Sequence, residues 1–102
     1  NRIYTSKELA QSSLIKNKIS FFSKRFAAKE AFAKALGTGF RKNLNFKDIE
    51  IINDKMGKPY YNKTSKITKL IKKKFKVTKF NCFLSISDES DYSTAFTIIQ
   101  SL

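Results

Sequence analysis

Four charged side chains lie at spacings that repeat along a helix within one short segment. Within ten residues the segment contains Arg25, Lys29, Glu30 and Lys34. Because each helical residue turns the chain by about 100°, the two earlier cations project from one side of a helix, and the carboxylate and the last lysine from another. Cations neutralise phosphate groups, and carboxylate oxygens are ligands that Mg²⁺ prefers. The segment therefore predicts a site for a polyanion together with a divalent metal ion.

The same side chains also have an interpretation without chemistry. Arg25 and Lys29 fall on the side of the predicted helix that carries its large apolar residues, where their stems can lie along apolar neighbours while the charges reach water. Glu30 and Lys34 lie one turn apart and can form a surface ion pair worth about 0.3 to 0.5 kcal/mol. Spacing alone favours this second interpretation, because most charged side chains on helices are simply solvated.

The composition limits which chemistry is available. The chain has 102 residues, no His and a single cysteine, Cys82. These counts exclude a Ser/His/Asp triad, structural zinc and haem ligation. One cysteine cannot form an internal disulfide, which favours a reducing compartment. A length of 102 residues predicts one small domain. The absence of an apolar run of about 18 residues predicts that it has no membrane span.

The elements that position the charged segment follow from periodicity and turn residues. Residues 20–36 contain no Gly or Pro, and Gly37 stands where a helix would end, so we predict one long helix. A mobile turn is expected at residues 37–39. Thr5 and Glu8 have the spacing of a capping box and predict a short helix to about residue 13. Residues 48–53 alternate like a half-buried strand, and residues 59–61 return as a second strand that Pro59 keeps short.

The second half of the chain predicts a helix and a hairpin. Residues 64–74 place three apolar side chains at helical spacing among five lysines, which predicts a basic surface helix. Residues 82–87 and 95–99 predict two strands joined through a polar segment. The order helix, helix, strand, strand, helix, strand, strand predicts an α+β fold, in which the long helix packs on a small, mostly antiparallel sheet.

A family resemblance decides between the two interpretations of the charged segment. Residues 26–34, FAAKEAFAK, look like the F-x-x-K-E-A-x-x-K signature of phosphopantetheinyl transferases. Residues 25–39, RFAAKEAFAKALGTG, resemble the small bacterial-type holo-acyl carrier protein synthases of the 4′-phosphopantetheinyl transferase family. Residues 46–51 with 57–59 are similar to that family's D-I-E and G-K-P hairpin. Residues 3–9 resemble its early helix and residues 84–87 its late strand. The resemblance covers nearly the whole chain.

The resemblance implies a fold, a reaction and roles for particular residues. It implies a single transferase domain over residues 1–102 whose N-terminal part is missing. The implied reaction moves the 4′-phosphopantetheine arm of coenzyme A onto a serine of acyl carrier protein, in the service of fatty acid synthesis. Glu30 would be catalytic as the Mg²⁺ ligand, and Lys34 would be catalytic by neutralising the pyrophosphate. Arg25, Lys29 and Lys58 would bind the remaining phosphates of coenzyme A.

Two departures from the family pattern concern this site. The family's Gly-Ile-Asp strand, which supplies a metal-binding Asp, has no counterpart here, and we attribute this to an absent N-terminus. The family usually has His directly after the Ser of the late strand, where this chain has Asp88, close to Glu89 and Asp91. For these three acids we favour a solvated hairpin turn over a binding site, because Asp is common in turns.

The charge balance suits an acidic partner and leaves two alternatives open. The formal net charge is +13, and a basic surface speeds encounter with an acidic acyl carrier protein. The first alternative is a nucleic-acid-binding domain, in which the lysines of residues 69–79 contact the backbone and neighbouring Phe residues stack on bases. The second is an inactive relative that only binds the carrier. The resemblance implies a homotrimer in the cytoplasm, or in a plastid-type organelle if a transit segment precedes the chain, and no membrane partner.

Overall fold

The long helix α2 is the centre of the fold. The computed structural model describes residues 2–37, 44–88 and 92–102. Helix α2 runs over Lys18–Leu36. Asn17 caps its first turn by accepting a hydrogen bond from the Ser20 N–H. Gly37 ends it in the left-handed conformation with φ of 84°, which is favourable for a residue without a Cβ. The long helix was therefore predicted correctly, and the rest of the predicted mobile turn lies outside the described residues.

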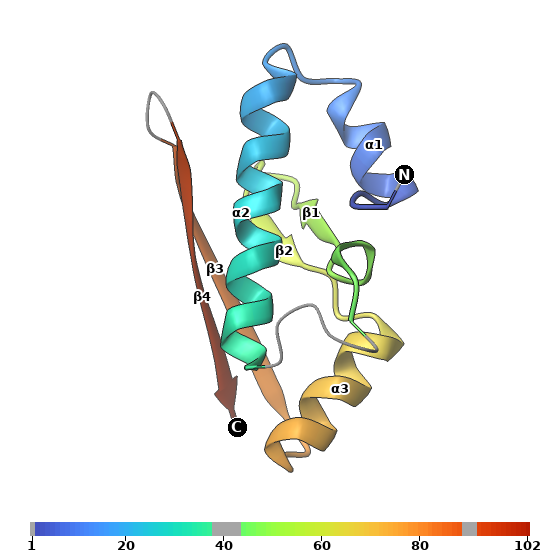
Figure 1. Cartoon of the computed structure of the whole chain (residues 1–102), viewed down its shortest axis with the longest axis vertical. Coiled ribbons are helices and arrows are strands. Elements are labelled where there is room, and N and C mark those ends of the chain that lie inside the picture. Colours follow the sequence, from blue (N-terminus) through green and yellow to red (C-terminus); the bar gives the residue numbers. More distant parts are fainter. Residues whose placement is uncertain (1, 38–43, 89–91) are drawn as a thin grey trace.

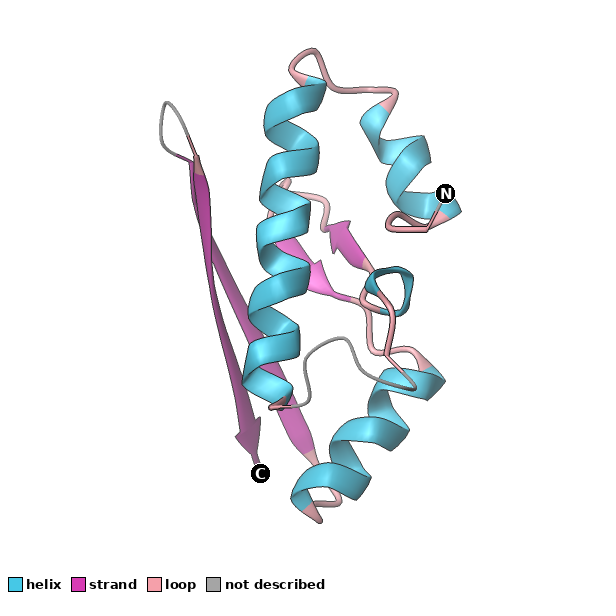
Figure 2. Ribbon diagram, viewed as in Figure 1, coloured by secondary structure: helices cyan, strands magenta, loops and turns pink. Residues whose placement is uncertain are grey.

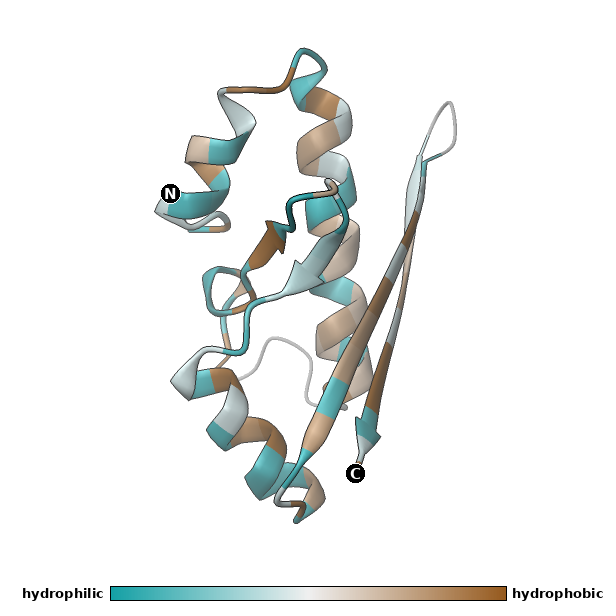
Figure 3. Ribbon diagram, turned by 180° about the vertical axis from the view of Figure 1, so that it is seen from behind, coloured by the Kyte–Doolittle hydropathy of each residue, from teal (hydrophilic) through white to brown (hydrophobic). Residues whose placement is uncertain are grey.

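A two-stranded hairpin covers one side of α2, on the left in Figure 1. Strand β3 (Phe80–Asp88) pairs antiparallel with β4 (Ser93–Ser101). The half-buried positions of the two strands face α2, and they alternate with exposed positions. Figure 3 shows hydrophobic residues recurring along these strands. The hairpin was predicted, although both strands extend beyond the predicted residues.

The opposite side of α2 is covered by shorter elements (Figure 2). These are α1 (Ser6–Ser12), the 3₁₀ turn η1 (Phe46–Asp48), the strands β1 (Ile51–Asn53) and β2 (Pro59–Tyr61), and α3 (Ser65–Phe75). Strands β1 and β2 form a second antiparallel pair. The main core is built from α2, β1, β2, α3 and the start of β3. Its buried members are Ala28, Phe32, Ala33, Leu36, Leu44, Ile49, Ile51, Tyr61, Ile67, Ile71 and Phe80.

The strand predicted at residues 48–53 is wrong in its first half. The Asp48 N–H donates to the Asn45 carbonyl at 3.0 Å, and the Ile49 N–H donates to the Phe46 carbonyl at 3.2 Å. The Asp48 carboxylate also accepts from the Asn45 N–H at 2.8 Å. These local hydrogen bonds form the η1 turn, so pairing in β1 begins only at Ile51.

The α+β class and the packing of a long helix on antiparallel strands are confirmed, with the strands arranged as two separate pairs. No helix in the described part of the chain is both long and apolar enough to cross a membrane.

Candidate functional site

Lys29 is buried inside the fold rather than at a binding surface. Its side chain is 0% exposed. The ammonium donates to Glu8 Oε1 at 2.8 Å, to the Phe46 carbonyl at 2.9 Å and to the Ile49 carbonyl. Burial lowers the pKa of Lys29 and outweighs the opposing effect of Glu8. The three N–H donors of an ammonium group are thus matched by three protein oxygens.

Glu8 is the anion that makes this burial possible. Its side chain is 0% exposed. Besides Lys29, its carboxylate accepts from the Thr5 N–H at 3.1 Å and from the Ile51 N–H at 3.1 Å. The predicted capping box is confirmed, because the Thr5 hydroxyl also accepts from the Glu8 N–H at 3.2 Å. Glu8 therefore joins α1, α2 and β1 through one carboxylate.

Two sequence-based interpretations of Lys29 need correction. Lys29 does not extend along apolar neighbours to reach water, because its ammonium is enclosed. The structure also does not support direct contact between Lys29 and coenzyme A, because the ammonium already donates to protein oxygens. The sequence assigned Glu8 only a capping role. A cation placed on the apolar side of the long helix was the signal that a buried partner was required.

Glu30 and Lys34 have the opposite character, since both side chains are exposed on α2. The surface ion pair considered for them is absent: ion pairs found among the described residues do not include either side chain. Among the described residues, neither the Glu30 carboxylate nor the Lys34 ammonium has a hydrogen-bond partner. The carboxylate and the ammonium are therefore available to a ligand.

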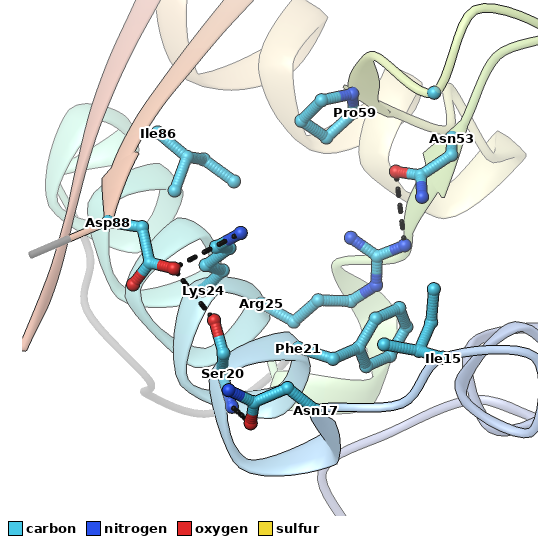
Figure 4. Close-up of a pocket in the computed structure, with 11 residues that line it drawn as sticks. Ile15, Asn17, Ser20, Phe21, Lys24, Arg25, Asn53, Pro59, Ile86 and Asp88 are labelled. Carbon is cyan, nitrogen blue, oxygen red and sulfur yellow. Dashed lines mark hydrogen bonds and ion pairs between the residues drawn. The ribbon is translucent and has the colours of Figure 1, made fainter. Parts of the chain in front are cut away.

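Arg25 lies at a cavity of about 320 Å³ (Figure 4). The cavity is lined by Ile15, Asn17, Ser20, Phe21, Lys24, Arg25, Asn53, Gly57, Pro59, Ile86 and Asp88. One terminal nitrogen of Arg25 donates to the Gln11 side chain at 2.9 Å and to the Asn53 side chain at 3.3 Å. The guanidinium carbon lies 4.3 Å from the centre of the Phe21 ring. Neutral side chains and an aromatic ring thus hold this cation in the cavity wall.

The charge of Arg25 is only partly compensated inside the protein. Its Nε lies 4.0 Å from Glu8 Oε2, the carboxylate that already binds Lys29. This Nε is buried and has no hydrogen-bond partner in the described part of the chain. Burial lowers the pKa of Arg25 below its ordinary value, while Glu8 opposes that change. An anion in the cavity would complete the electrostatic environment of this guanidinium.

Lys58 lies at the edge of the same cavity. It follows Gly57 and precedes Pro59, both of which line the cavity, and its own side chain is exposed. The Asp54 carboxylate shapes this turn by accepting from the Met56 and Lys58 N–H groups, each at 2.9 Å. The turn therefore places Lys58 between two residues that line the cavity.

Asp88 ends β3 at the cavity and is bound by α2. Its Oδ2 accepts from the Ser20 hydroxyl at 2.8 Å and lies 3.3 Å from Lys24 Nζ. Its Oδ1 accepts from the Ser93 hydroxyl at 3.1 Å. The hydrogen bond from Ser20, followed by those from Lys24 and Ser93, lowers the pKa of Asp88. Asp88 is exposed, as predicted, but it is the last residue of β3 and pairs with Ser93 instead of lying in the turn, and it joins the hairpin to α2. Glu89 and Asp91 lie outside the described residues.

The predicted site residues do not converge within one chain. Arg25 lines the cavity and Lys58 lies beside it, whereas neither Glu30 nor Lys34 lines it. Glu30 follows Arg25 by five residues, which is about 140° around the helix axis. No group of three or more metal-binding side chains forms among the residues that the structure describes. One chain therefore presents the cavity with Arg25 on one side of α2 and the exposed Glu30 and Lys34 on another.

Comparison with known proteins identifies the family. The model of the 4′-phosphopantetheinyl transferase superfamily matches residues 1–97. The chain belongs to this superfamily. Its sequence is 62% identical to the holo-[acyl-carrier-protein] synthase of Pelagibacter ubique over 99 residues, which is 97% of this chain and 77% of that relative. It is 44% identical to the corresponding synthase of Zymomonas mobilis, with 97% and 75% of the two chains covered.

Solved structures of the superfamily share the fold. The crystal structure of the Neisseria meningitidis holo-[acyl-carrier-protein] synthase superposes with a TM-score of 0.83 at 37% identity, covering 98% of this chain and 78% of that chain. The Bacillus anthracis synthase, solved in complex with CoA, superposes with a TM-score of 0.79 at 34% identity, covering 100% and 79%. The predicted family and transferase fold are confirmed.

Proposed function

We propose that this chain transfers the 4′-phosphopantetheine group of coenzyme A to a serine hydroxyl of an acyl carrier protein. In this reaction the serine oxygen forms a bond to the phosphorus next to the pantetheine arm. The bond from that phosphorus to the bridging oxygen breaks, adenosine 3′,5′-bisphosphate leaves with the electron pair of that bond, and the serine hydroxyl proton is released to water. The synthases named above support this assignment by their likeness over nearly the whole chain. The observation that carries the proposal is that Glu30 and Lys34 lie one turn apart on α2, exposed and without an ion-pair or hydrogen-bond partner among the described residues.

Glu30 suits one position in a Mg²⁺ site. Its carboxylate is exposed and has no partner among the described residues. Mg²⁺ commonly uses only one or two carboxylates and completes its octahedron with waters and substrate phosphates. A bound Mg²⁺ would supply charge neutralisation for the pyrophosphate. Glu30 would hold that ion in place, because α2 is anchored next to it by the buried Lys29.

Lys34 suits the role of neutralising the leaving group. It follows Glu30 by one helical turn, and its ammonium has no anion partner in the described structure. Phosphoryl-type transfer requires positioned positive charge more than covalent help from the protein. The chain lacks His, which is consistent with chemistry that relies on charge and position.

The cavity suits a phosphate group of coenzyme A. Arg25 contributes a buried guanidinium, and Lys58 contributes an exposed ammonium at the edge. We assign both to coenzyme A binding. For Lys29 we assign a supporting role, in which it holds α2 through Glu8 and the backbone before β1.

The separation of these groups supports a homotrimer in which one subunit's cavity faces Glu30 and Lys34 of a neighbour. The outer face of the β3–β4 hairpin suits the contact, since Phe83, Phe96 and Ile98 are 49%, 75% and 54% exposed. In light scattering, Phe96→Asp should yield monomers, because assembly would bury the new charge. An unchanged mass for that variant would exclude this face as the contact.

The surface of α3 suits an acidic carrier protein. Its last turn carries Lys72, Lys73 and Lys74, all exposed. The Lys74 Cε lies 3.9 Å from the position that a Cβ on Gly37 would occupy. Lys74 therefore lies near Gly37 at the end of α2, three residues beyond Lys34. Positive charge at this position would steer an acidic partner toward the reacting groups. The cytoplasmic or organellar location and the link to fatty acid synthesis stay predictions.

The decisive experiment measures transfer directly. Apo-carrier protein is incubated with coenzyme A, Mg²⁺ and the protein, and the mass gain of the carrier is followed. We expect transfer by the wild type, loss of transfer in Glu30→Gln because a neutral amide binds Mg²⁺ poorly, and partial activity in Glu30→Asp. Circular dichroism of each variant provides the folding control. Wild-type protein that leaves the carrier mass unchanged would contradict the proposed function, and full activity of Glu30→Gln at limiting Mg²⁺ would remove Glu30 from the metal site.

A further inference from the structure

The cavity contains one anion among its cations. Two of its lining residues, Lys24 and Arg25, are positively charged, and Asp88 is negatively charged. Figure 4 shows Asp88 and Lys24 together on one side of the cavity and Arg25 on the other. A carboxylate is an unfavourable neighbour for a phosphate group, because like charges repel strongly in a partly enclosed space.

Asp88 also forms an ion pair with Lys24, a cation that could otherwise bind the ligand. Its Oδ2 lies 3.3 Å from Lys24 Nζ, and the two side chains are 41% and 40% exposed. The Ser20 hydroxyl donates to the same oxygen at 2.8 Å. The pair thus faces the cavity while both its members remain accessible. Of the two cavity cations, Lys24 is paired with a carboxylate, whereas Arg25 is held mainly by neutral side chains.

From this geometry we infer that Asp88 lowers the affinity of the cavity for phosphate groups, by repelling them and by holding Lys24. The inference rests on the proposed function, since it takes the phosphate to be one of coenzyme A. The same repulsion acts on adenosine 3′,5′-bisphosphate, the product of the transfer. Asp88 therefore keeps product binding weak and favours its release.

The arrangement predicts a particular non-additivity between two substitutions. Asp88→Asn removes the negative charge but keeps an oxygen that can accept from Ser20. It should tighten binding of coenzyme A and of the bisphosphate about three- to ten-fold at low salt, as expected for one unit charge several ångströms from a phosphate near a protein surface. Lys24→Gln should change affinity less than about two-fold in the wild type, but should remove most of the gain in the Asp88→Asn background.

Calorimetric titration of the four proteins with coenzyme A, dephospho-coenzyme A and the bisphosphate tests this inference. An effect of Asp88→Asn on coenzyme A but not on dephospho-coenzyme A supports it and assigns the cavity to the 3′-phosphate. An equal effect on both supports it and assigns the cavity to the pyrophosphate. Unchanged or weaker binding by Asp88→Asn, or equal effects of Lys24→Gln in both backgrounds, would overturn it.

Two controls separate charge from folding. Ser93→Ala removes a hydrogen bond to Asp88 without changing charge, and it should leave affinity unchanged; a gain equal to that of Asp88→Asn would overturn the inference. Asp88→Ser provides a second variant should the Asn variant not fold. Transfer is assayed separately, so wild-type protein that binds coenzyme A without transferring the group contradicts the proposed function alone. Failure of all four proteins to bind any of the three compounds overturns the inference, while the transfer assay alone decides the proposed function.

Discussion

Removing the charge of Glu8 should destabilise the protein severely, because it leaves the Lys29 ammonium buried without an anion. The two groups are 2.8 Å apart, and both side chains are 0% exposed. Breaking a buried pair by removing one partner costs about 3 to 5 kcal/mol. Since a small domain is stable by only about 5 to 15 kcal/mol in total, Glu8→Gln should lose a large share of its free energy of unfolding.

Urea unfolding followed by circular dichroism, at one protein concentration, measures the loss. With a slope near 1.5 kcal/mol per molar urea, the midpoint should fall by about 2 to 3 M. Glu8→Gln combined with Lys29→Met removes both charges and should recover most of the stability, because apolar side chains of similar volume can replace a buried pair.

A matched control is the exposed pair of Lys66 and Asp48. Its nitrogen and oxygen also lie 2.8 Å apart, but its side chains are 46% and 21% exposed. Lys66→Gln should therefore cost less than about 1 kcal/mol. A comparably small loss in Glu8→Gln, or no recovery in the double variant, would refute the argument that burial makes the Glu8–Lys29 pair important.

The pH dependence offers a second readout of the same pair. Burial lowers the pKa of Lys29 below its ordinary 10.5. In the range between the two values the unfolded chain binds more protons than the folded one, so stability rises with pH there. The pKa should fall further in Glu8→Gln, and the stability difference from the wild type should narrow as pH approaches 10.5.

Three further predictions follow. Lys34→Ala should lower kcat by two or more orders of magnitude, because a cation placed at developing negative charge contributes about 3 kcal/mol, and KM for coenzyme A should change less. A higher KM with an unchanged kcat would show that Lys34 only binds substrate. Reversing the three lysines in the last turn of α3 to Glu should slow association with the carrier without changing coenzyme A affinity, and the wild-type rate should fall as salt rises through about 0.2 M; unchanged carrier kinetics with loss of nucleic-acid binding would favour the nucleic-acid alternative. Burial alone would raise the pKa of Glu50, but hydrogen bonds from Thr5 and Asn62 and nearby cations lower it. Stability should therefore fall as pH drops below 4.5, and a melting temperature constant from neutral pH to about pH 3 would contradict this.

The sequence alone determined the local features of this protein. Gly37 and the absence of Gly and Pro before it predicted the long helix, because helix ends and interiors depend on neighbouring residues. The runs at residues 82–87 and 95–99, joined by a polar segment, predicted the β3–β4 hairpin in the same local way. The spacing of Arg25, Lys29, Glu30 and Lys34 allowed a charged site but by itself favoured solvated side chains, and the motif around these residues decided for the site and led to the superfamily.

Only the tertiary structure decided what each charge does. Lys29 and Glu30 are adjacent in sequence, yet one is enclosed and the other is exposed. The difference arises because Glu8, 21 residues away, supplies a buried carboxylate on the side that Lys29 faces. Asp88 accepts a hydrogen bond from Ser20, which is 68 residues away in the sequence. Asp88 was predicted to lie in a solvated turn, but this contact places it in the wall of the cavity. Pairings at such separations depend on how the elements pack, and local spacing carries no information about that packing.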